Sequence, residues 1–155
     1  MAREAATDRS NGQTEPETPS RPAGLKVLDR LVGTWRVSGE TQGTITYEWL
    51  DGGFFMIARG DIDQGGKKTR HMEIIGYDHA PGSEPASTTT SRLYTSRGDT
   101  LNYTHEVDEK RVTSWFGEKG SPGVFKAQWS DDGNTLTGAW EWPGGGYKLT
   151  MTRVK

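Results

Sequence analysis

The chain contains no cysteine and carries almost no net charge: 19 lysine and arginine residues against 21 aspartate and glutamate residues give a formal charge of −2. Without cysteine there is no disulfide, no thiolate zinc site and no cysteine nucleophile, a usage typical of reducing compartments. The near-neutral charge does not attract a phosphate backbone, so we expect no nucleic-acid partner. No window approaches about 18 consecutive apolar residues, so we expect no membrane-spanning helix.

Residues 1–22 contain no Val, Ile, Leu, Phe, Trp or Tyr. Such a segment buries too little apolar surface to offset the entropy lost on ordering, so we expect a disordered arm. The segment also lacks the apolar stretch of a secretory signal, which favours a cytoplasmic protein. Residues 23–155 are then enough for one domain.

The first apolar pattern after this arm has helical spacing. Leu25, Leu28, Leu31 and Val32 follow one another at intervals of three, three and one, so that one helix face is apolar. This pattern predicts a short amphipathic helix over residues 23–32 that ends at Gly33.

Beyond Gly33, apolar and polar residues alternate, and glycine-rich turns interrupt the alternation. This is typical of strands with one covered face, joined by tight hairpins. We predict about ten strands, at residues 34–42, 44–50, 54–63, 68–78, 88–96, 100–107, 111–116, 124–130, 135–142 and 147–154. Short connections force antiparallel neighbours, and closure removes the exposed sheet edges. The sequence therefore predicts an all-β protein, a closed antiparallel up-and-down barrel with a short N-terminal helix.

A family resemblance rests on several segments. A helix followed by Gly33-Thr34-Trp35, with Arg153 on the last strand, resembles the GxW…Arg signature of the calycin superfamily, which includes lipocalins and fatty-acid-binding proteins. The ordered set LVGTWRVSGE, TYEWLDGGFF, EIIGYD, FGEKGSP, SDDGNTLTGAW and EWPGGGY is similar to a bacterial family, the domain of unknown function numbered 1579, which is nitrobindin-like or lipocalin-like in fold. The resemblance covers residues 24–155 and implies a calycin-like barrel.

Gly33, Trp35 and Arg153 have a structural interpretation that does not depend on the family. In a closed meander the last strand neighbours the first, so Arg153 can reach Trp35. A guanidinium group stacked on an indole ring contributes about 0.5 to 2 kcal/mol. We expect this pair to close the floor of the barrel.

A ten-stranded barrel is wide enough to enclose a cavity, and apolar cavities with a few polar groups are the usual ligand sites. The register set by Trp35 and Arg153 points the alternate residues of the last strand inward. Apolar alternation adds aromatic residues from other strands. The predicted ligand contacts are Tyr47, Trp49, Tyr103, His105, Trp129, Trp140, Tyr147 and Met151, with Phe125, Leu149 and Trp142 on the same faces and Met56 or Met72 as further candidates. The alternative is that these aromatic residues form an ordinary core.

The polar candidates for chemistry are His71, Glu73, His105 and Arg59. His71 and Glu73 are two residues apart on one strand and share a face, and His105 lies two strands further on. Two imidazoles and a carboxylate have the composition of an acid–base or metal site, although no ligand spacing predicts a metal. Which face of the strand at 68–78 points inward stays open, because Met72 is as plausible there as His71.

Nitrobindins bind haem, so the resemblance raises haem as a cofactor. The family's iron ligand is a histidine near the end of the barrel, whereas residues 106–155 contain no histidine. Methionine, tyrosine and histidine side chains also serve as haem ligands, so Met151, Tyr147 and His105 are the remaining candidates for an iron ligand. The sequence therefore favours a protein without a cofactor and keeps haem as an alternative.

Taken together, the sequence favours a monomer or homodimer that binds a small hydrophobic or aromatic molecule in its barrel. The first alternative is a cofactor-free isomerase or cyclase in which His71, Glu73, His105 or a tyrosine moves a proton. The second alternative is a nitrobindin-like haem protein. The fold alone does not decide among these functions.

Overall fold

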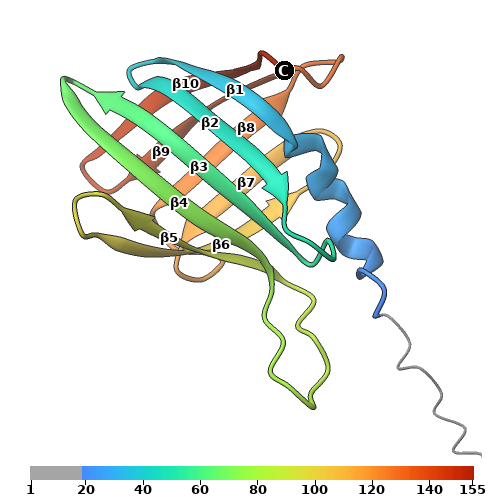
Figure 1. The fold of residues 1–155 in the computed structure, drawn as a ribbon. Helices are drawn as coiled ribbons and strands as arrows, with labels where there is room; N and C mark the ends of the chain where they lie inside the picture. The colour runs from blue at the N-terminus through green and yellow to red at the C-terminus, as the bar shows by residue number, and fades with distance from the viewer. Residues whose placement is uncertain (1–18) are drawn as a thin grey trace, which may run out of the picture.

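The computed structural model describes residues 19–155, so residues 1–18 of the expected arm lie outside the described residues. Ten antiparallel strands form a closed barrel in which each strand pairs with the next along the chain and the last pairs with the first (Figure 1). The strands are Gly33–Gly39 (β1), Gln42–Trp49 (β2), Phe55–Gln64 (β3), Lys67–Tyr77 (β4), Thr89–Thr95 (β5), Thr100–Val107 (β6), Arg111–Phe116 (β7), Val124–Trp129 (β8), Thr135–Trp142 (β9) and Gly145–Arg153 (β10). The predicted barrel is confirmed, and each strand lies within a few residues of its predicted bounds.

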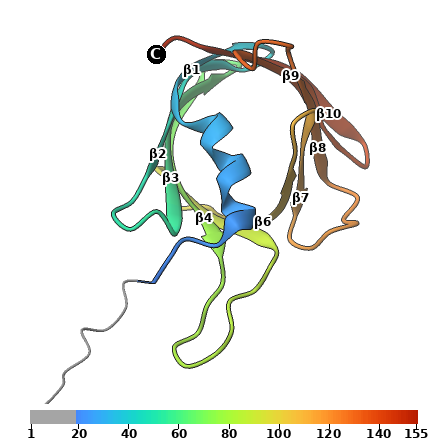
Figure 2. The same cartoon turned by 90° about the vertical axis from the view of Figure 1, so that its right-hand side faces the viewer.

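The N-terminal helix η1, Ala23–Leu31, lies across one end of the barrel (Figure 2). It is a 3₁₀ helix, and its buried residues are Leu25, Leu28 and Leu31. Their spacing of three matches the three residues per turn of this helix type. Val32 follows the last turn and is exposed rather than sharing the apolar face. The helix is therefore confirmed, while the place of Val32 differs from the prediction.

Trp35 and Arg153 form the floor of the barrel above this helix. The Trp35 side chain is fully buried, and the guanidinium carbon of Arg153 lies 4.2 Å from its ring centre. Nε1 of Trp35 donates a hydrogen bond to the carbonyl oxygen of Leu31 (2.7 Å). Arg153 donates to the carbonyl oxygens of Arg30 and Val32. The predicted pair thus joins the first strand, the last strand and the helix.

Gly33 opens β1 at the same place. Its φ of +127° is disfavoured for other residues, and a Cβ atom there would collide with the carbonyl oxygen of Lys155. A glycine is therefore required where the start of β1 passes the end of the chain.

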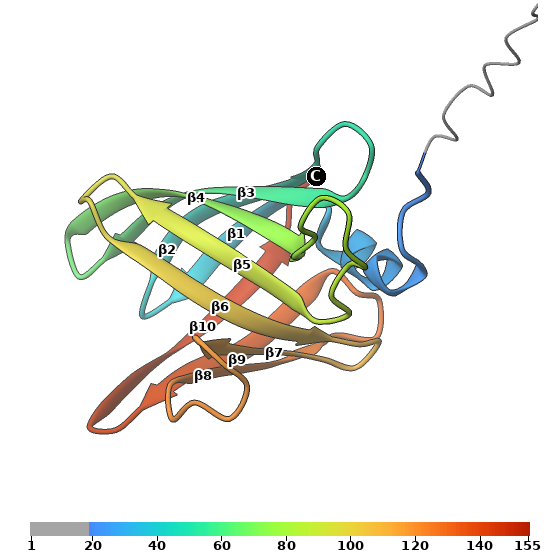
Figure 3. The same cartoon turned by 90° about the horizontal axis from the view of Figure 1, so that it is seen from below.

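The two ends of the barrel differ. η1 and the long loop between β4 and β5 lie at one end, while the β3–β4, β5–β6 and β9–β10 turns lie at the other (Figure 3). The helix covers the first end, and the interior is reached from the second. Among residues 19–155, no helix is long and apolar enough to cross a membrane.

Candidate functional site

The barrel contains a cavity of about 550 Å³ between the Trp35 floor and the open end. Most of its wall is apolar, and its volume falls within the range of about 300 to 1,000 Å³ that is common for small-molecule sites. On one side, the rings of Tyr103, Phe116, Phe125 and Trp140 pack together with centres 4.7 to 5.7 Å apart. The cavity therefore has a wall of aromatic rings.

Six of the eight predicted ligand contacts line this cavity: Tyr47, Tyr103, His105, Trp140, Tyr147 and Met151. The other two, Trp49 and Trp129, lie at the helix end instead. Nε1 of Trp49 donates to the Asp29 carboxylate of η1 (2.8 Å). Trp129 packs against Trp35, with ring centres 5.9 Å apart. Both tryptophans point inward as predicted but lie below the cavity. Alternation specifies the face of a strand and not the height along the barrel, so it did not distinguish these two positions from the cavity wall.

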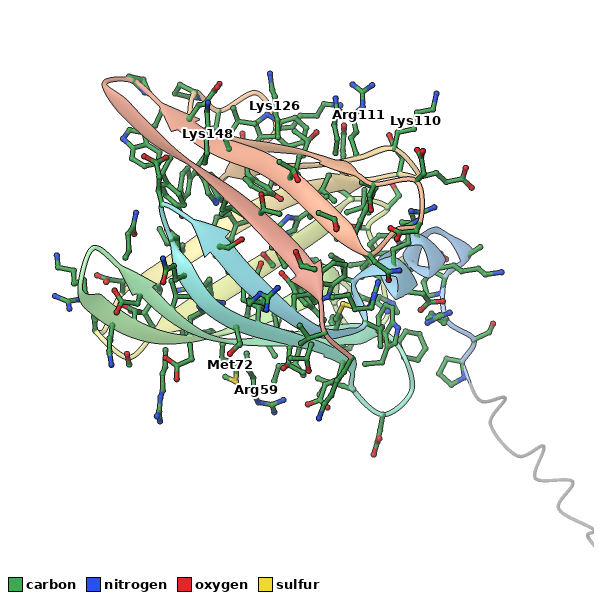
Figure 4. The ribbon with its side chains drawn as sticks, turned by 90° about the horizontal axis from the view of Figure 1, so that it is seen from above. Arg59, Met72, Lys110, Arg111, Lys126 and Lys148 are labelled. Atoms are coloured by element: carbon green, nitrogen blue, oxygen red, sulfur yellow. The ribbon has the colours of Figure 1, made fainter. Side chains whose placement is uncertain are left out.

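The positions of the polar residues of β4 show which face of this strand points into the barrel. His71 and Glu73 line the cavity. Met72 and Arg59 instead point away from the barrel (Figure 4), so neither can serve as a cavity residue. Gly60 on β3 is the register partner of His71, and a Cβ atom at position 60 would collide with the imidazole ring. The missing side chain thus makes room for an inward histidine.

A chain of four hydrogen-bonded side chains crosses β4, β5, β6 and β7 in the barrel wall. The hydroxyl of Ser91 donates to Oε2 of Glu73 (2.5 Å) and lies 2.7 Å from Nε2 of His105. Nδ1 of His105 lies 2.6 Å from the hydroxyl of Ser114. Glu73, Ser91 and Ser114 are buried. The predicted pair of Glu73 and His105 is thus brought together, with Nε2 and Oε2 3.3 Å apart.

Sequence reasoning missed Ser91 and Ser114. The only signal was their position on an inward strand face: Ser91 is two residues before Leu93, and Ser114 is two residues before Phe116. That signal is weak, because serine is common in strands and turns for reasons of solvation alone.

The hydrogens of this chain can be assigned. Ser91 has one hydroxyl hydrogen, which it donates to Glu73, so Nε2 of His105 must carry the hydrogen that Ser91 accepts. We assign the hydroxyl hydrogen of Ser114, which has no other side-chain partner among the described residues, to the bond with Nδ1; in an imidazolium the same bond would run from Nδ1 to Ser114. A neutral imidazole with its hydrogen on Nε2 satisfies every group. The chain then carries one negative charge, on Glu73.

The pKa values of Glu73 and His71 indicate the charges that these two groups carry in the cavity. Burial by itself raises the pKa of Glu73, but hydrogen bonds from His105 and Ser91 and the charges that His105 and His71 can carry outweigh it, so the pKa lies below its ordinary value. Burial lowers the pKa of His71, although the nearby Glu73 carboxylate opposes this shift. At neutral pH the cavity therefore contains a Glu73 carboxylate and a neutral His71 imidazole.

Three tyrosines complete the polar part of the wall. Burial raises the pKa of the Tyr47, Tyr103 and Tyr147 phenols, and the Glu73 charge raises it further for Tyr47 and Tyr103. All three phenols are therefore neutral donors at pH 7. None of them donates a hydrogen bond to a protein side chain or carbonyl within residues 19–155. Among the described residues only Oγ1 of Thr41 is a fully buried side-chain polar atom without a partner, so the three phenol oxygens are accessible from the cavity and available to a ligand.

Haem fits the three iron-ligand candidates of the sequence, His105, Tyr147 and Met151, poorly. Both ring nitrogens of His105 already take part in hydrogen bonds. The raised pKa of Tyr147 works against the phenolate that iron requires, and Met151 is buried in the core near the floor. Within residues 19–155, no three His, Asp or Glu side chains converge closely enough to hold a metal ion.

No family model matches this chain, and no curated protein matches it. The resemblance to the calycin superfamily and to its bacterial family therefore stays a prediction. The closed ten-stranded barrel rests on the structure itself.

Proposed function

We propose that the protein binds one small, hydrophobic or aromatic molecule inside its barrel. The observation that carries this proposal is the cavity of about 550 Å³, which combines an apolar wall with phenols that no protein group satisfies. An apolar wall contributes affinity by removing ligand surface from water, and a few polar groups fix the orientation of the ligand. We place this binding in the cytoplasm, in a protein that acts without a cofactor.

The test is a titration with Nile red, a neutral dye whose fluorescence rises in apolar surroundings. Leu101→Trp and Met72→Trp are a matched pair, because the two side chains are 38% and 40% exposed but only Leu101 lines the cavity. Saturable binding that Leu101→Trp weakens and Met72→Trp leaves unchanged supports the proposal. Equal effects of the two substitutions would place the dye on the outer surface, and no saturable binding would refute the cavity as a ligand site.

A second candidate function is proton transfer on the bound molecule, as in a small isomerase or cyclase. The hydrogen-bonded chain of Ser114, His105, Ser91 and Glu73 favours it. The hydroxyl of Ser114 lines the cavity, so it can accept a proton from the bound molecule while passing its own hydrogen to Nδ1 of His105. Nε2 keeps its hydrogen toward Ser91 and Glu73, which stabilises the resulting imidazolium. His105 would be the general base, and Glu73 would orient it.

This second function is tested with phenylacetone in heavy water. Exchange of its acidic C–H hydrogens is followed by proton NMR, in wild type, in His105→Ala and in Glu106→Gln. Glu106 is exposed on the outer face of β6 and serves as the control. Accelerated exchange that only His105→Ala removes supports an enzyme. Exchange at the uncatalysed rate in all three proteins refutes proton transfer on this class of ketone.

A further inference from the structure

We propose that the ligand of the barrel carries a protonated amine, which pairs with the Glu73 carboxylate, on a hydrophobic or aromatic body. This inference rests on the proposed binding function and names the chemical class of the ligand. It starts from the Glu73 carboxylate, which lines the cavity, has one oxygen without a side-chain partner and lies beside a histidine that we assign as neutral.

A buried carboxylate is costly unless it is paired. Under the assignment above His105 is neutral and its contact with Glu73 is a hydrogen bond, whereas a protonated His105 would make the same contact an ion pair. The other oxygen of the carboxylate, Oε1, accepts no hydrogen bond from any described side chain. Glu73 therefore offers a free acceptor oxygen, Oε1, to a molecule in the cavity, and with His105 neutral its charge is unbalanced as well.

Basic side chains of the protein do not supply the missing cation. Lys110 in the β6–β7 turn and Arg111, Lys126 and Lys148 on β7, β8 and β10 point away from the barrel (Figure 4). Among the described residues that line the cavity, the only lysine or arginine is Lys67. Lys67 lies at the β3–β4 turn and is exposed, so water screens its charge from the interior.

The groups around Glu73 suit a cation. Tyr47 and Glu73 flank Ala58 as its register partners on β2 and β4, and the ring of Tyr103 lies 5.8 Å from that of His105, so both phenols are near the carboxylate. The ring of Tyr103 is in turn 5.7 Å from that of Trp140. Aromatic faces attract an ammonium group, most strongly where water is excluded. A carboxylate beside several aromatic rings is therefore selective for an amine over a neutral or anionic end group.

The apolar wall restricts the rest of the ligand. Phe116, Phe125 and Leu149 lie in the same cavity and offer no partner to a polar chain. An arylalkylamine matches both parts of the site, because its amine reaches Glu73 while its ring contacts the apolar wall. A ligand that is polar throughout would lose hydrogen bonds to water without replacing them.

The experiment compares phenylpropylamine, phenylpropanol and phenylpropanoate by isothermal titration calorimetry at pH 7.5. The three probes share one body and differ in the charge of the end group. We expect the amine to bind about ten times more tightly than the alcohol, as for a charge-assisted hydrogen bond, and the carboxylate to bind most weakly. Glu73→Gln is expected to reduce the affinity of the amine to that of the alcohol, while Glu106→Gln on the outer face changes neither.

The outcomes separate the two proposals. If the alcohol or the carboxylate binds as tightly as the amine, the inference about the amine is wrong and the binding function stands. If none of the three probes binds, the binding function and the inference are both refuted. The comparison in wild type does not depend on the folding of Glu73→Gln, and alcohol binding by that variant reports whether its cavity is intact.

Discussion

The guanidinium group of Arg153 lies 4.2 Å from the ring centre of Trp35, and the two residues face each other across β1 and β10. Replacing Arg153 with leucine removes this contact and leaves the carbonyl oxygens of Arg30 and Val32 without their donor. We expect the free energy of unfolding to fall by about 2 to 3 kcal/mol. Urea denaturation followed by tryptophan fluorescence measures the loss.

Arg92→Leu is the matched control for this experiment. Arg92 also lies over an aromatic ring, that of Tyr94 at 5.6 Å, but the pair is on the outer face of β5 and Tyr94 is 45% exposed. We expect its loss to cost less than about 1 kcal/mol. Equal losses in Arg153→Leu and Arg92→Leu would show that the floor contact has no special role.

The protonation of His105 is a second prediction. Because Ser91 accepts from Nε2 and we assign Ser114 as the donor to Nδ1, we expect the neutral tautomer with its hydrogen on Nε2 at pH 7. Nitrogen-15 NMR of the imidazole ring distinguishes this tautomer from its alternatives. In Ser114→Ala, which removes the donor to Nδ1, the Nδ1 resonance is expected to shift the most. A ring protonated on both nitrogens would contradict the charge assigned to the chain.

The extent to which the sequence predicts this fold follows from the periodicity of its residues. Alternation located every strand, because a barrel wall has one apolar and one solvated face along its length. The 3₁₀ form of η1 was not predicted, although the leucines at positions 25, 28 and 31 already follow its period of three. Val32 lies four residues after Leu28, and this spacing indicated the wider apolar face of an α-helix.

The candidate site was harder to predict, for two physical reasons. Both faces of β4 contain apolar residues, so alternation does not show which one points inward. The contacts of Glu73 with Ser91 on β5 and His105 on β6 identify the face of His71 and Glu73 as the inner one. On β2 and β8, alternation correctly turned Trp49 and Trp129 inward. It contains no information on height, so it did not separate the floor from the cavity.

A titration with hemin gives a third prediction. The ring nitrogens of His105 are occupied by Ser91 and Ser114, and the pKa of Tyr147 is raised, so we expect no Soret band of a ligated haem. His71 is the imidazole that lines the cavity without a side-chain partner among the described residues. A Soret band that appears in wild type and is lost in His71→Ala would contradict this prediction and identify His71 as the iron ligand.

Acid is expected to destabilise the protein through His71. Burial holds the pKa of His71 below its ordinary value of 6.5, so below pH 6.5 the unfolded chain binds a proton that the folded chain resists. The free energy of unfolding therefore has its full value above pH 6.5, and it falls as the pH drops from 6.5 toward the lower pKa of His71 in the folded state. His71→Gln, which does not titrate, is expected to flatten this part of the profile, whereas His79→Gln in the exposed β4–β5 loop retains it. Urea midpoints measured from pH 8 to pH 5 test this, and parallel profiles for wild type and His71→Gln would mean that folding does not lower the pKa of His71.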